Sequence, residues 1–342
     1  MGRLKNICFL LIILLFTNLT ACSISNEPIS KSSFFMGTIV NITLYDKKNQ
    51  SILEKVFKEI NTLEEKFSLN IPSSEVNEIN KNAGNSPVKV SNETFEIINK
   101  AIEISKMSKG SFDITIGPLV NLWGIGSDKA RLPSKSEIDY CLDLIGYENI
   151  ILDESIKSVF LKKEKMILDL GAIAKGYIAD IIKDMLINEG IKKAIIDLGG
   201  NIFALGEKSK NTPWTIGIQN PFENRGTPLG TLKITNQSVV TSGIYERFLE
   251  VEGIKYHHIL NPSTGYPFHN ELASVSIISS KSIDGDALST ATFALGIEDG
   301  LNLINSLNDI EAIFVNKNRE IYLSNGLTNN FELLNKDFTI IR

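Results

Sequence analysis

The succession of helical and strand-like patterns restricts the fold of this chain more than any single motif does. Apolar residues between positions 53 and 67 recur every three or four residues, which predicts an amphipathic helix with Ser51 as its N-cap. A second helical pattern over residues 95–107 stops at Gly110. Residues 214–279 instead form short alternating segments separated by Gly and Pro, which is typical of antiparallel sheet. Because helices and strands do not alternate regularly, we expect an α+β fold with mixed and antiparallel sheets and packed helices, rather than a doubly wound sheet.

The remaining patterns are shorter. Helices are predicted over residues 175–188, before Gly190, and over residues 286–295. Strands are predicted at residues 34–45, 150–152, 159–161, 166–169, 194–197, 312–315 and 320–323. No internal repeat or low-complexity segment interrupts this series. About 320 residues after the N-terminal leader suffice for one large domain or two intimate subdomains.

The N-terminal segment has the form of a secretory signal. Arg3 and Lys5 precede an unbroken apolar run over residues 7–16, which is too short to span a bilayer comfortably, and Leu-Thr-Ala follows directly before Cys22. This ending resembles the lipobox of bacterial lipoproteins, in which Cys22 becomes the lipid-modified N-terminus. A retained membrane helix is the alternative. We therefore expect a lipoprotein signal peptide at residues 1–21, a polar tether at residues 22–33 and one folded domain at residues 34–342.

Cysteine and charge counts narrow the class of protein. Cys8 would leave with the signal, Cys22 would carry lipid and Cys141 would be alone. No disulfide can then form within the mature chain, so its stability must come from a core. The formal charge of the whole chain is −5, and removal of Arg3 and Lys5 with the signal leaves −7. An acidic chain without basic clusters argues against nucleic acid as a partner.

The most informative local segment spans residues 169–180. A strand-like run brings Asp169, Gly171, small neighbouring residues and Lys175 to the start of a helix. Small residues let a ligand approach the backbone closely, and unpaired N–H groups at a helix start attract anions. An ordinary strand-to-helix turn explains such a loop equally well.

Three other segments combine glycine with polar or aromatic residues. Residues 110–126 contain a Gly-Ser-Phe-Asp sequence and Trp123, and they form either a loop with buried aromatic side chains or a wall for a planar aromatic ligand. Residues 197–201, Asp-Leu-Gly-Gly-Asn, have the composition of a tight hairpin turn. Residues 241–247, Thr-Ser-Gly-Ile-Tyr-Glu-Arg, end a strand-like run in either a turn or a ligand site.

Two of the three histidines of the chain are adjacent, His257 and His258. The segment is typical of a strand that runs into a turn containing Pro and Gly, so neighbouring side chains point to opposite faces. Only one histidine of the pair can therefore face a given site.

Asp286, Ser289 and Thr290 lie at positions i, i+3 and i+4 of a predicted helix and therefore share one face. A carboxylate beside a hydroxyl suits a hard cation such as Mg²⁺, which prefers oxygen ligands and retains water. Capping of the helix by Asp284 or Asp286 is the structural alternative.

Taken in order, these motifs resemble the ApbE family of FAD:protein FMN transferases. The resemblance covers nearly all of the mature chain and rests on residues 36–38, 111–115, 118–124, 169–176, 199–201, 241–243, 258–265 and 286–290. It implies an ApbE-like fold and the transfer of FMN from FAD to a threonine hydroxyl of target flavoproteins, with release of AMP and with Mg²⁺ as cofactor. The lipoprotein start agrees with it, because many members are exported and lipid-anchored.

The resemblance also implies the residues of the site. FAD would be held by Met36, Ser111, Phe112, Asp113, Asp169, Lys175 and Leu260. The metal would be bound by the backbone carbonyl of Ala172 together with Asp286, Ser289 and Thr290. One departure is visible at Asn70, because many members place an aromatic residue over the flavin at this point.

The transfer chemistry adds a base to this set. A threonine hydroxyl must lose a proton near neutral pH, and His258 is the natural acceptor because of the pKa of its side chain. An aspartate beside the metal is the alternative. Lys175 would supply a fixed positive charge to the phosphates.

Two other functions stay open at this point. A Mg²⁺-dependent FAD pyrophosphatase giving FMN and AMP would use the same pocket with water as the nucleophile. A non-catalytic flavin-binding lipoprotein would have little need for a metal. In the leading interpretation the enzyme is lipid-anchored at the extracytoplasmic face of the cell membrane. Its partners are FAD and exported or membrane flavoproteins with an acceptor threonine.

Overall fold

The computed structural model describes residues 27–46, 49–327 and 330–341. Its centre is a nine-stranded sheet with the strand order β1-β2-β6-β7-β10-β13-β14-β15-β17. The strands are β1 (Ile29–Phe35), β2 (Thr38–Leu44), β6 (Ala194–Leu198), β7 (Asn201–Leu205), β10 (Gln237–Gly243), β13 (Leu272–Ser279), β14 (Ile310–Asn316), β15 (Glu320–Leu323) and β17 (Thr339–Ile341). Neighbouring strands are antiparallel except for the parallel pair β15 and β17.

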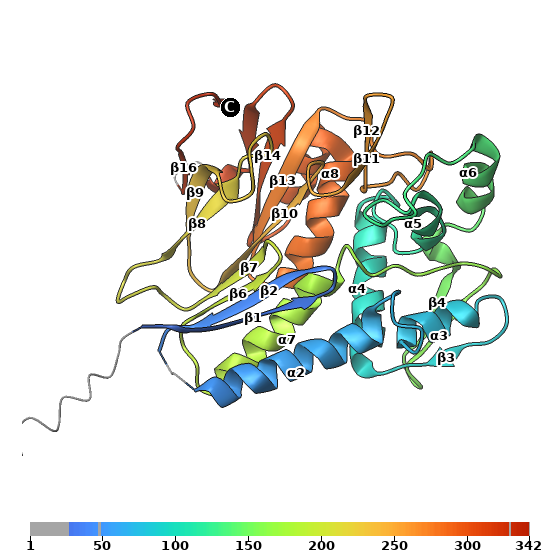
Figure 1. Ribbon diagram of the computed structural model, residues 1–342, viewed down its shortest axis with the longest axis horizontal. Coiled ribbons are helices and arrows are strands. Elements are labelled where there is room, and N and C mark those ends of the chain that lie inside the picture. The colour runs from blue at the N-terminus through green and yellow to red at the C-terminus, as the bar shows by residue number, and fades with distance from the viewer. Residues whose placement is uncertain (1–26, 47–48, 328–329, 342) are drawn as a thin grey trace, which may run out of the picture.

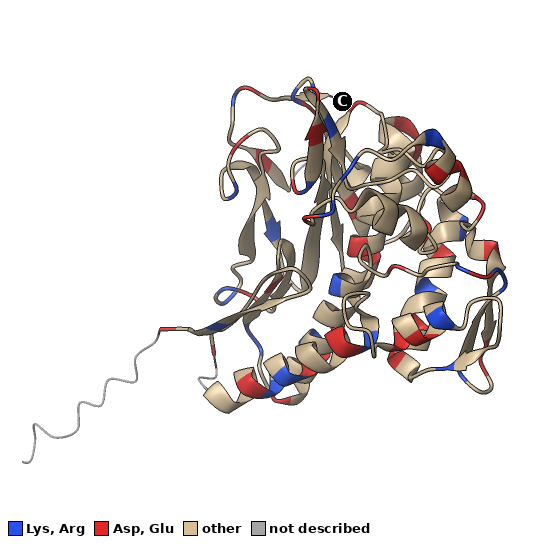
Figure 2. Ribbon diagram, turned by 45° about the vertical axis from the view of Figure 1, so that its right-hand side comes forward, with Lys and Arg blue, Asp and Glu red and all other residues tan. Residues whose placement is uncertain are grey.

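Helices cover one face of this sheet (Figure 1). Helices α2 (Gln50–Phe67), α7 (Ala174–Asn188) and α8 (Ser282–Asn305) pack on its strands, and α4 (Asn92–Met107) packs on α8. Helix α3 (Glu75–Lys81) packs on α2, whereas α5 (Gly117–Trp123) and α6 (Lys135–Leu142) pack on each other away from the sheet. Basic and acidic residues are interspersed along the helices (Figure 2). In the part of the chain that the structure describes, no helix combines the length and the apolar character needed to cross a membrane.

Three small sheets complete the fold. One has the order β16-β9-β8 and consists of β8 (Trp214–Gln219), β9 (Pro228–Ile234) and β16 (Phe331–Leu333). A second consists of β3 (Val88–Lys89), β4 (Ile150–Asp153) and β5 (Ser158–Leu161), and the third pairs β11 (Phe248–Val251) with β12 (Ile254–His257). Two short 3₁₀ turns lie at Tyr147–Asn149 and Asn325–Leu327. The predicted α+β fold with mixed and antiparallel sheets is confirmed.

The core consists of layers on both faces of the large sheet. One apolar cluster joins the sheet to α2, α4, α7 and α8, and a second joins its other face to the β16-β9-β8 sheet. All residues of β13 are buried, because this strand lies between the two clusters. A third, smaller cluster surrounds Trp123 between α5 and α6.

Helix α2 is amphipathic, as the spacing of its apolar residues predicts. Its buried residues are Ile52, Leu53, Val56, Phe57, Ile60, Leu63 and Phe67, which all lie on the face toward the sheet. The predicted N-cap is wrong by two residues. Asn49 is the cap, and its side-chain oxygen accepts hydrogen bonds from the backbone N–H of Ser51 at 3.0 Å and from the Ser51 hydroxyl at 2.9 Å.

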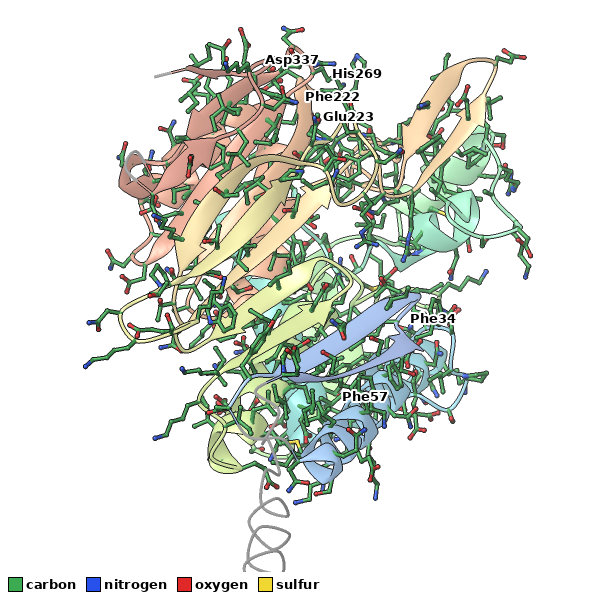
Figure 3. The ribbon with its side chains drawn as sticks, turned by 60° about the vertical axis from the view of Figure 1, so that its left-hand side comes forward. Phe34, Phe57, Phe222, Glu223, His269 and Asp337 are labelled. Atoms are coloured by element: carbon green, nitrogen blue, oxygen red, sulfur yellow. The ribbon has the colours of Figure 1, made fainter. Side chains whose placement is uncertain are left out.

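The predicted strand at residues 34–45 is instead a hairpin of β1 and β2. Met36 and Gly37 form its two-residue turn with φ angles of 50° and 71°, as a tight hairpin turn of this type requires. The alternating pattern continues across this turn and so conceals it. Phe35 packs inward, with its ring centroid 6.0 Å from that of Phe57 on α2, whereas Phe34 lies on the exposed face (Figure 3).

Three further features differ from the sequence prediction. Strand β1 begins at Ile29, so the folded domain starts earlier than residue 34 and includes part of the predicted tether. The predicted signal peptide and Cys22 lie outside the described residues. Residues 166–169 do not form a strand, since their pairing is an isolated bridge between Ile116 and Ile167. Helix α8 is longer than predicted and kinks at Gly296, where φ is 81°.

Candidate active site

The hairpin turns at one end of the large sheet, the end of α2 and the N-termini of α7 and α8 enclose a cavity of about 1250 Å³. The predicted site residues on its wall are Met36, Ser111, Phe112, Asp113, Asp169, Ala172, Lys175, His258, Leu260, Asp286 and Thr290. Ser289 is fully buried and lies behind this wall. Segments that are far apart in the sequence therefore meet at one place, as the motifs predict.

Asp286 joins the two helices at the base of the cavity. One carboxylate oxygen accepts a hydrogen bond from the backbone N–H of Gly176 at 2.8 Å, and the other lies 3.3 Å from Nζ of Lys175. The side chain of Asp286 is 5% exposed and that of Lys175 is 26% exposed, so the carboxylate is buried while the ammonium is partly accessible from the cavity. Asp286 thus caps the first turn of α7, although it belongs to α8.

Gly176 makes this contact possible. A Cβ at position 176 would lie 2.3 Å from the Ser282 carbonyl oxygen and 2.7 Å from Cβ of Asp286. Any side chain there would push the helices apart. Asp180, one turn later on α7, accepts hydrogen bonds from the backbone N–H groups of Ser282 and Ile283, both at 3.0 Å. The two helix starts therefore exchange carboxylate caps.

Capping of its own helix by Asp284, the structural alternative from the sequence, does not occur. Its carboxylate pairs with Lys100 on α4 at 2.8 Å. The N-terminus of α8 is satisfied by Asp180 instead.

Asp169 shapes the loop that leads into α7. Its carboxylate accepts a hydrogen bond from the Gly171 N–H at 2.7 Å. Burial raises the pKa of Asp169, while that hydrogen bond and the charges of Lys175 and Arg247 oppose the rise. The negative charge of this loop is therefore held between two cations.

The donor atoms near Asp286 fit a hard metal ion. Oγ of Ser242 lies 2.8 Å from Oγ of Ser289 and 3.3 Å from Oγ1 of Thr290, and the Ser289 hydroxyl donates to the Asp286 carbonyl at 2.8 Å. The described residues contain no cluster of three or more His, Cys, Asp or Glu side chains that would suit a transition metal. One carboxylate with hydroxyl and carbonyl oxygens suits Mg²⁺, and the ammonium beside Asp286 shows that this carboxylate attracts a cation.

The two histidines have separate surroundings, as the strand pattern predicts. His257 is buried, and its Nε2 lies 2.9 Å from the Phe268 carbonyl oxygen. His258 lines the cavity, and its Nδ1 lies 3.2 Å from the Arg247 carbonyl oxygen. A carbonyl can only accept, so the contact places the proton on Nδ1 and leaves Nε2 as an acceptor. Burial lowers the pKa of His258 to about 4, so its imidazole is neutral at pH 7.

Comparison with known proteins decides the family. The model of the ApbE family matches residues 36–314. The chain belongs to the ApbE family. A relative from Klebsiella pneumoniae (strain 342), named FAD:protein FMN transferase, is 43% identical and aligns over 92% of this chain and 98% of its own length. A relative of the same name from Treponema pallidum (strain Nichols) is 34% identical over 92% of this chain and 91% of its own.

Solved ApbE structures have the same fold. The ApbE protein from Thermotoga maritima matches with a TM-score of 0.81 at 32% identity, covering 88% of this chain and 98% of that chain. The flavin transferase ApbE from Vibrio cholerae matches with a TM-score of 0.80 at 26% identity, covering 89% and 99%. The resemblance inferred from the motifs is thus confirmed.

Within this ApbE site, Asp113 and Trp123 serve the loop more than the cavity. Both carboxylate oxygens of Asp113 are engaged, one by the backbone N–H and hydroxyl of Thr115 and the other by the Tyr147 N–H. Trp123 is fully buried and donates its indole N–H to the Gly265 carbonyl at 2.8 Å. Phe112 is the aromatic residue of this segment that reaches the wall. Trp123 therefore fits the alternative of a buried aromatic side chain, whereas a ligand wall that includes Phe112 stays a prediction.

Sequence reasoning missed three residues of the ApbE cavity: Glu64, Ser242 and Arg247. The Glu64 carboxylate accepts a hydrogen bond from the Met36 N–H at 2.6 Å and so fixes the β1–β2 turn. Glu64 lies in an amphipathic helix among other charged residues, where nothing distinguishes it. Ser242 and Arg247 belong to a segment that did attract attention, but its spacing gave them no role.

Proposed function

We propose that this chain catalyses the Mg²⁺-dependent transfer of FMN from FAD to a threonine hydroxyl of target flavoproteins, with release of AMP. The chain is an enzyme of the FAD:protein FMN transferase type, as its relatives are named. The single observation that carries the proposal is the buried contact of Asp286 with Lys175, on the same cavity wall as the neutral imidazole of His258. A protein that only binds flavin has no need for this combination.

The size of the cavity also supports a two-substrate reaction. Pockets for one small ligand measure roughly 300–1,000 Å³. The cavity here is about 1250 Å³ and has walls of glycine turns, apolar side chains and charged groups. It leaves room for an acceptor segment beside a dinucleotide.

The chemistry assigns a task to each residue. The threonine oxygen bonds to the phosphorus of the FMN half, and the bond from that phosphorus to the oxygen of the AMP phosphate breaks. Nε2 of His258 takes the hydroxyl proton, because this nitrogen is unprotonated at neutral pH. Lys175 contributes positive charge next to the phosphates. The Ala172 carbonyl, Asp286 and Thr290, with Ser289 behind them, would hold Mg²⁺, which would supply electrostatic stabilisation of the phosphate oxygens when bound.

The place of action belongs to the proposal as well. We infer a lipid-anchored enzyme at the extracytoplasmic face of the membrane, from the basic start, the apolar run at residues 7–16 and the small residues before Cys22. Its acceptors are then exported or membrane flavoproteins. Growth with a radiolabelled fatty acid tests the anchor, since Cys22→Ser should abolish the label.

The reaction is tested with the chain from Glu27 onward, FAD, Mg²⁺ and a candidate acceptor domain. Flavin fluorescence that stays on the acceptor through denaturing electrophoresis supports the transferase. Free FMN and AMP without a labelled acceptor would favour the pyrophosphatase instead. Bound FAD without either product would indicate a flavin-binding protein.

A further inference from the structure

We propose that Arg247 is a second cationic substrate-binding residue, whose guanidinium binds the pyrophosphate of FAD. It approaches the cavity from the turn between β10 and β11, whereas Lys175 approaches from α7. The assignment rests on the proposed function and refines it, because it names the part of FAD that this segment recognises.

Two glycine turns make room for the Arg247 side chain. A Cβ on Gly37 would lie 3.3 Å from Nη2 of Arg247, and a Cβ on Gly126 would lie 3.0 Å from its Cδ. Both glycines have positive φ, 71° and 90°. One belongs to the β1–β2 turn and the other to the loop after α5, so segments that are distant in the sequence meet at this one side chain. Arg247 is an exposed residue on the cavity wall, and its side chain runs close past both turns, where a residue larger than glycine would crowd it.

The charge of Arg247 is unused by the protein itself. The Arg247 carbonyl accepts hydrogen bonds from the ring and the backbone N–H of His258. Within the described residues, the Arg247 guanidinium makes no hydrogen bond or ion pair with another protein group. Lys175, by contrast, already contacts Asp286 and the Gly171 carbonyl. A guanidinium presents five N–H donors in a planar fork that matches phosphate oxygens. A cation without a protein partner on the wall of this cavity is thus suited to an anionic ligand.

The charge of Arg247 acts on titratable groups in the part of the cavity around Asp169 and His258. Burial raises the pKa of Asp169 in the loop before α7, and the charge of Arg247 opposes that rise. Burial lowers the pKa of His258, and the charge of Arg247 adds to that fall. Lys175 acts on the same two groups in the same directions. The two cations therefore influence one region of the cavity, where two phosphates of a dinucleotide need two positive charges.

The test compares ligands with and without a pyrophosphate. Arg247→Gln removes the charge but keeps the backbone carbonyl that contacts His258. We expect its affinity for FAD, measured by quenching of flavin fluorescence, to fall by roughly 10- to 100-fold, the loss of a charge-assisted hydrogen bond of about 1.5–3 kcal/mol. Affinity for riboflavin should change less than about twofold, because riboflavin has no phosphate. Arg247→Lys should recover part of the FAD affinity.

Arg319→Gln is the matched control. The Arg319 guanidinium pairs with Asp337 at 3.0 Å and does not line the cavity, so its loss should leave FAD affinity unchanged. An Arg247→Gln protein that binds FAD as tightly as the wild type would overturn the assignment. Equal weakening of FAD and riboflavin would overturn it too, because the residue would then only shape the wall.

The two proposals fail in different ways. Suppose that the wild type binds FAD but transfers no FMN, and that Arg247→Gln lowers the affinity for FAD but not for riboflavin. The transferase proposal then fails and the assignment of Arg247 stands. If the wild type transfers FMN and Arg247→Gln leaves FAD affinity intact, only the assignment of Arg247 fails. Melting curves of each variant show that the compared proteins are folded.

Discussion

Asp286 illustrates how one carboxylate can hold a fold and a site together. It caps α7 through the Gly176 N–H and balances Lys175, while it is also the proposed metal ligand. Sequence spacing predicts its shared face with Thr290, but the spacing says nothing of α7. The contact spans 110 positions of the sequence, so only the packing of the two helices reveals it.

Asp286→Asn should separate these tasks. The amide oxygen of Asn can still accept the hydrogen bond from the Gly176 N–H, so the fold and FAD binding should persist. Loss of the negative charge, however, removes the proposed carboxylate ligand of the metal. We expect FMN transfer to fall by more than about 100-fold. Transfer and FAD binding are measured on the same preparation over a Mg²⁺ titration. Transfer at the wild-type rate would exclude this residue as metal ligand.

His258 should set an unusually low acid limit for the reaction. Its pKa is lowered from 6.5 to about 4 because burial disfavours the charged imidazolium. The proton-accepting form therefore persists as the pH falls from 7 to 5 and is lost only near pH 4. We expect the acid limb of kcat/KM that depends on His258 near pH 4. A limb near pH 6.5 that disappears in His258→Gln would show that the site does not lower this pKa.

For single residues, the sequence predicts the surroundings of a side chain where the local spacing determines the direction in which that side chain points. The separation of His257 from His258 follows from strand alternation alone, and the structure confirms it. Asp113 shows the limit of this approach. The resemblance assigns Asp113 to FAD, which stays a prediction, but the motif does not show that its carboxylate also bonds to Thr115 and to Tyr147, a partner remote in the sequence.

At the level of elements, the close crossing of α7 and α8 positions the proposed metal and phosphate residues. The two helices touch through the backbone at Gly176, and the exchanged caps of Asp180 and Asp286 hold their first turns together. Periodicity predicts the length of α7 and underestimates that of α8, and the distance between the two helices depends on the absence of a side chain at Gly176.

Gly176→Ala should be damaging although Ala is the better helix former. The added Cβ would overlap the Ser282 carbonyl and Asp286. We expect the free energy of unfolding to fall by about 1–3 kcal/mol, together with a loss of transfer activity, because Asp286 moves. Urea denaturation and the transfer assay measure the two effects. Gly226→Ala is the comparison, since a Cβ there meets no atom within 4 Å and tests only the cost of its positive φ. Equal stability of the wild type and Gly176→Ala would contradict the close packing.

The errors of sequence reasoning at this scale have physical causes. Alternation continues through Met36 and Gly37, so the β1–β2 hairpin looks like one strand, and only the two left-handed φ angles show the turn. Residues 166–169 have a β-type composition but find no neighbouring strand beyond one bridge. Strand pairing depends on partners, which a local pattern does not contain.

At the scale of the whole molecule, strand β1 completes the edge of the large sheet. It pairs with β2 along its length, and the Phe35 ring lies near Phe57 on α2. A chain that begins at Phe34, the predicted domain start, lacks most of this strand. A chain that begins at Glu27 keeps it.

We expect the chain that starts at Phe34 to melt roughly 10 °C lower than the chain that starts at Glu27, since a loss of several kcal/mol shifts the midpoint by about 2–4 °C per kcal/mol in domains of this size. FAD affinity should fall as well, because Met36 and Gly37 lose the strand that holds their turn. Differential scanning calorimetry and flavin quenching measure both. Identical melting curves would show that β1 contributes nothing to the fold.

Lys175 stands beside Asp286 as its counter-ion. It can turn fully toward a phosphate only by leaving that carboxylate, and its departure strands a buried negative charge unless another cation arrives. If magnesium binds Asp286 as proposed, it would neutralise that charge, so binding of the metal and binding of FAD would be coupled and each would raise the affinity of the other by the same factor. We therefore expect the wild-type protein to bind FAD more weakly in the absence of magnesium.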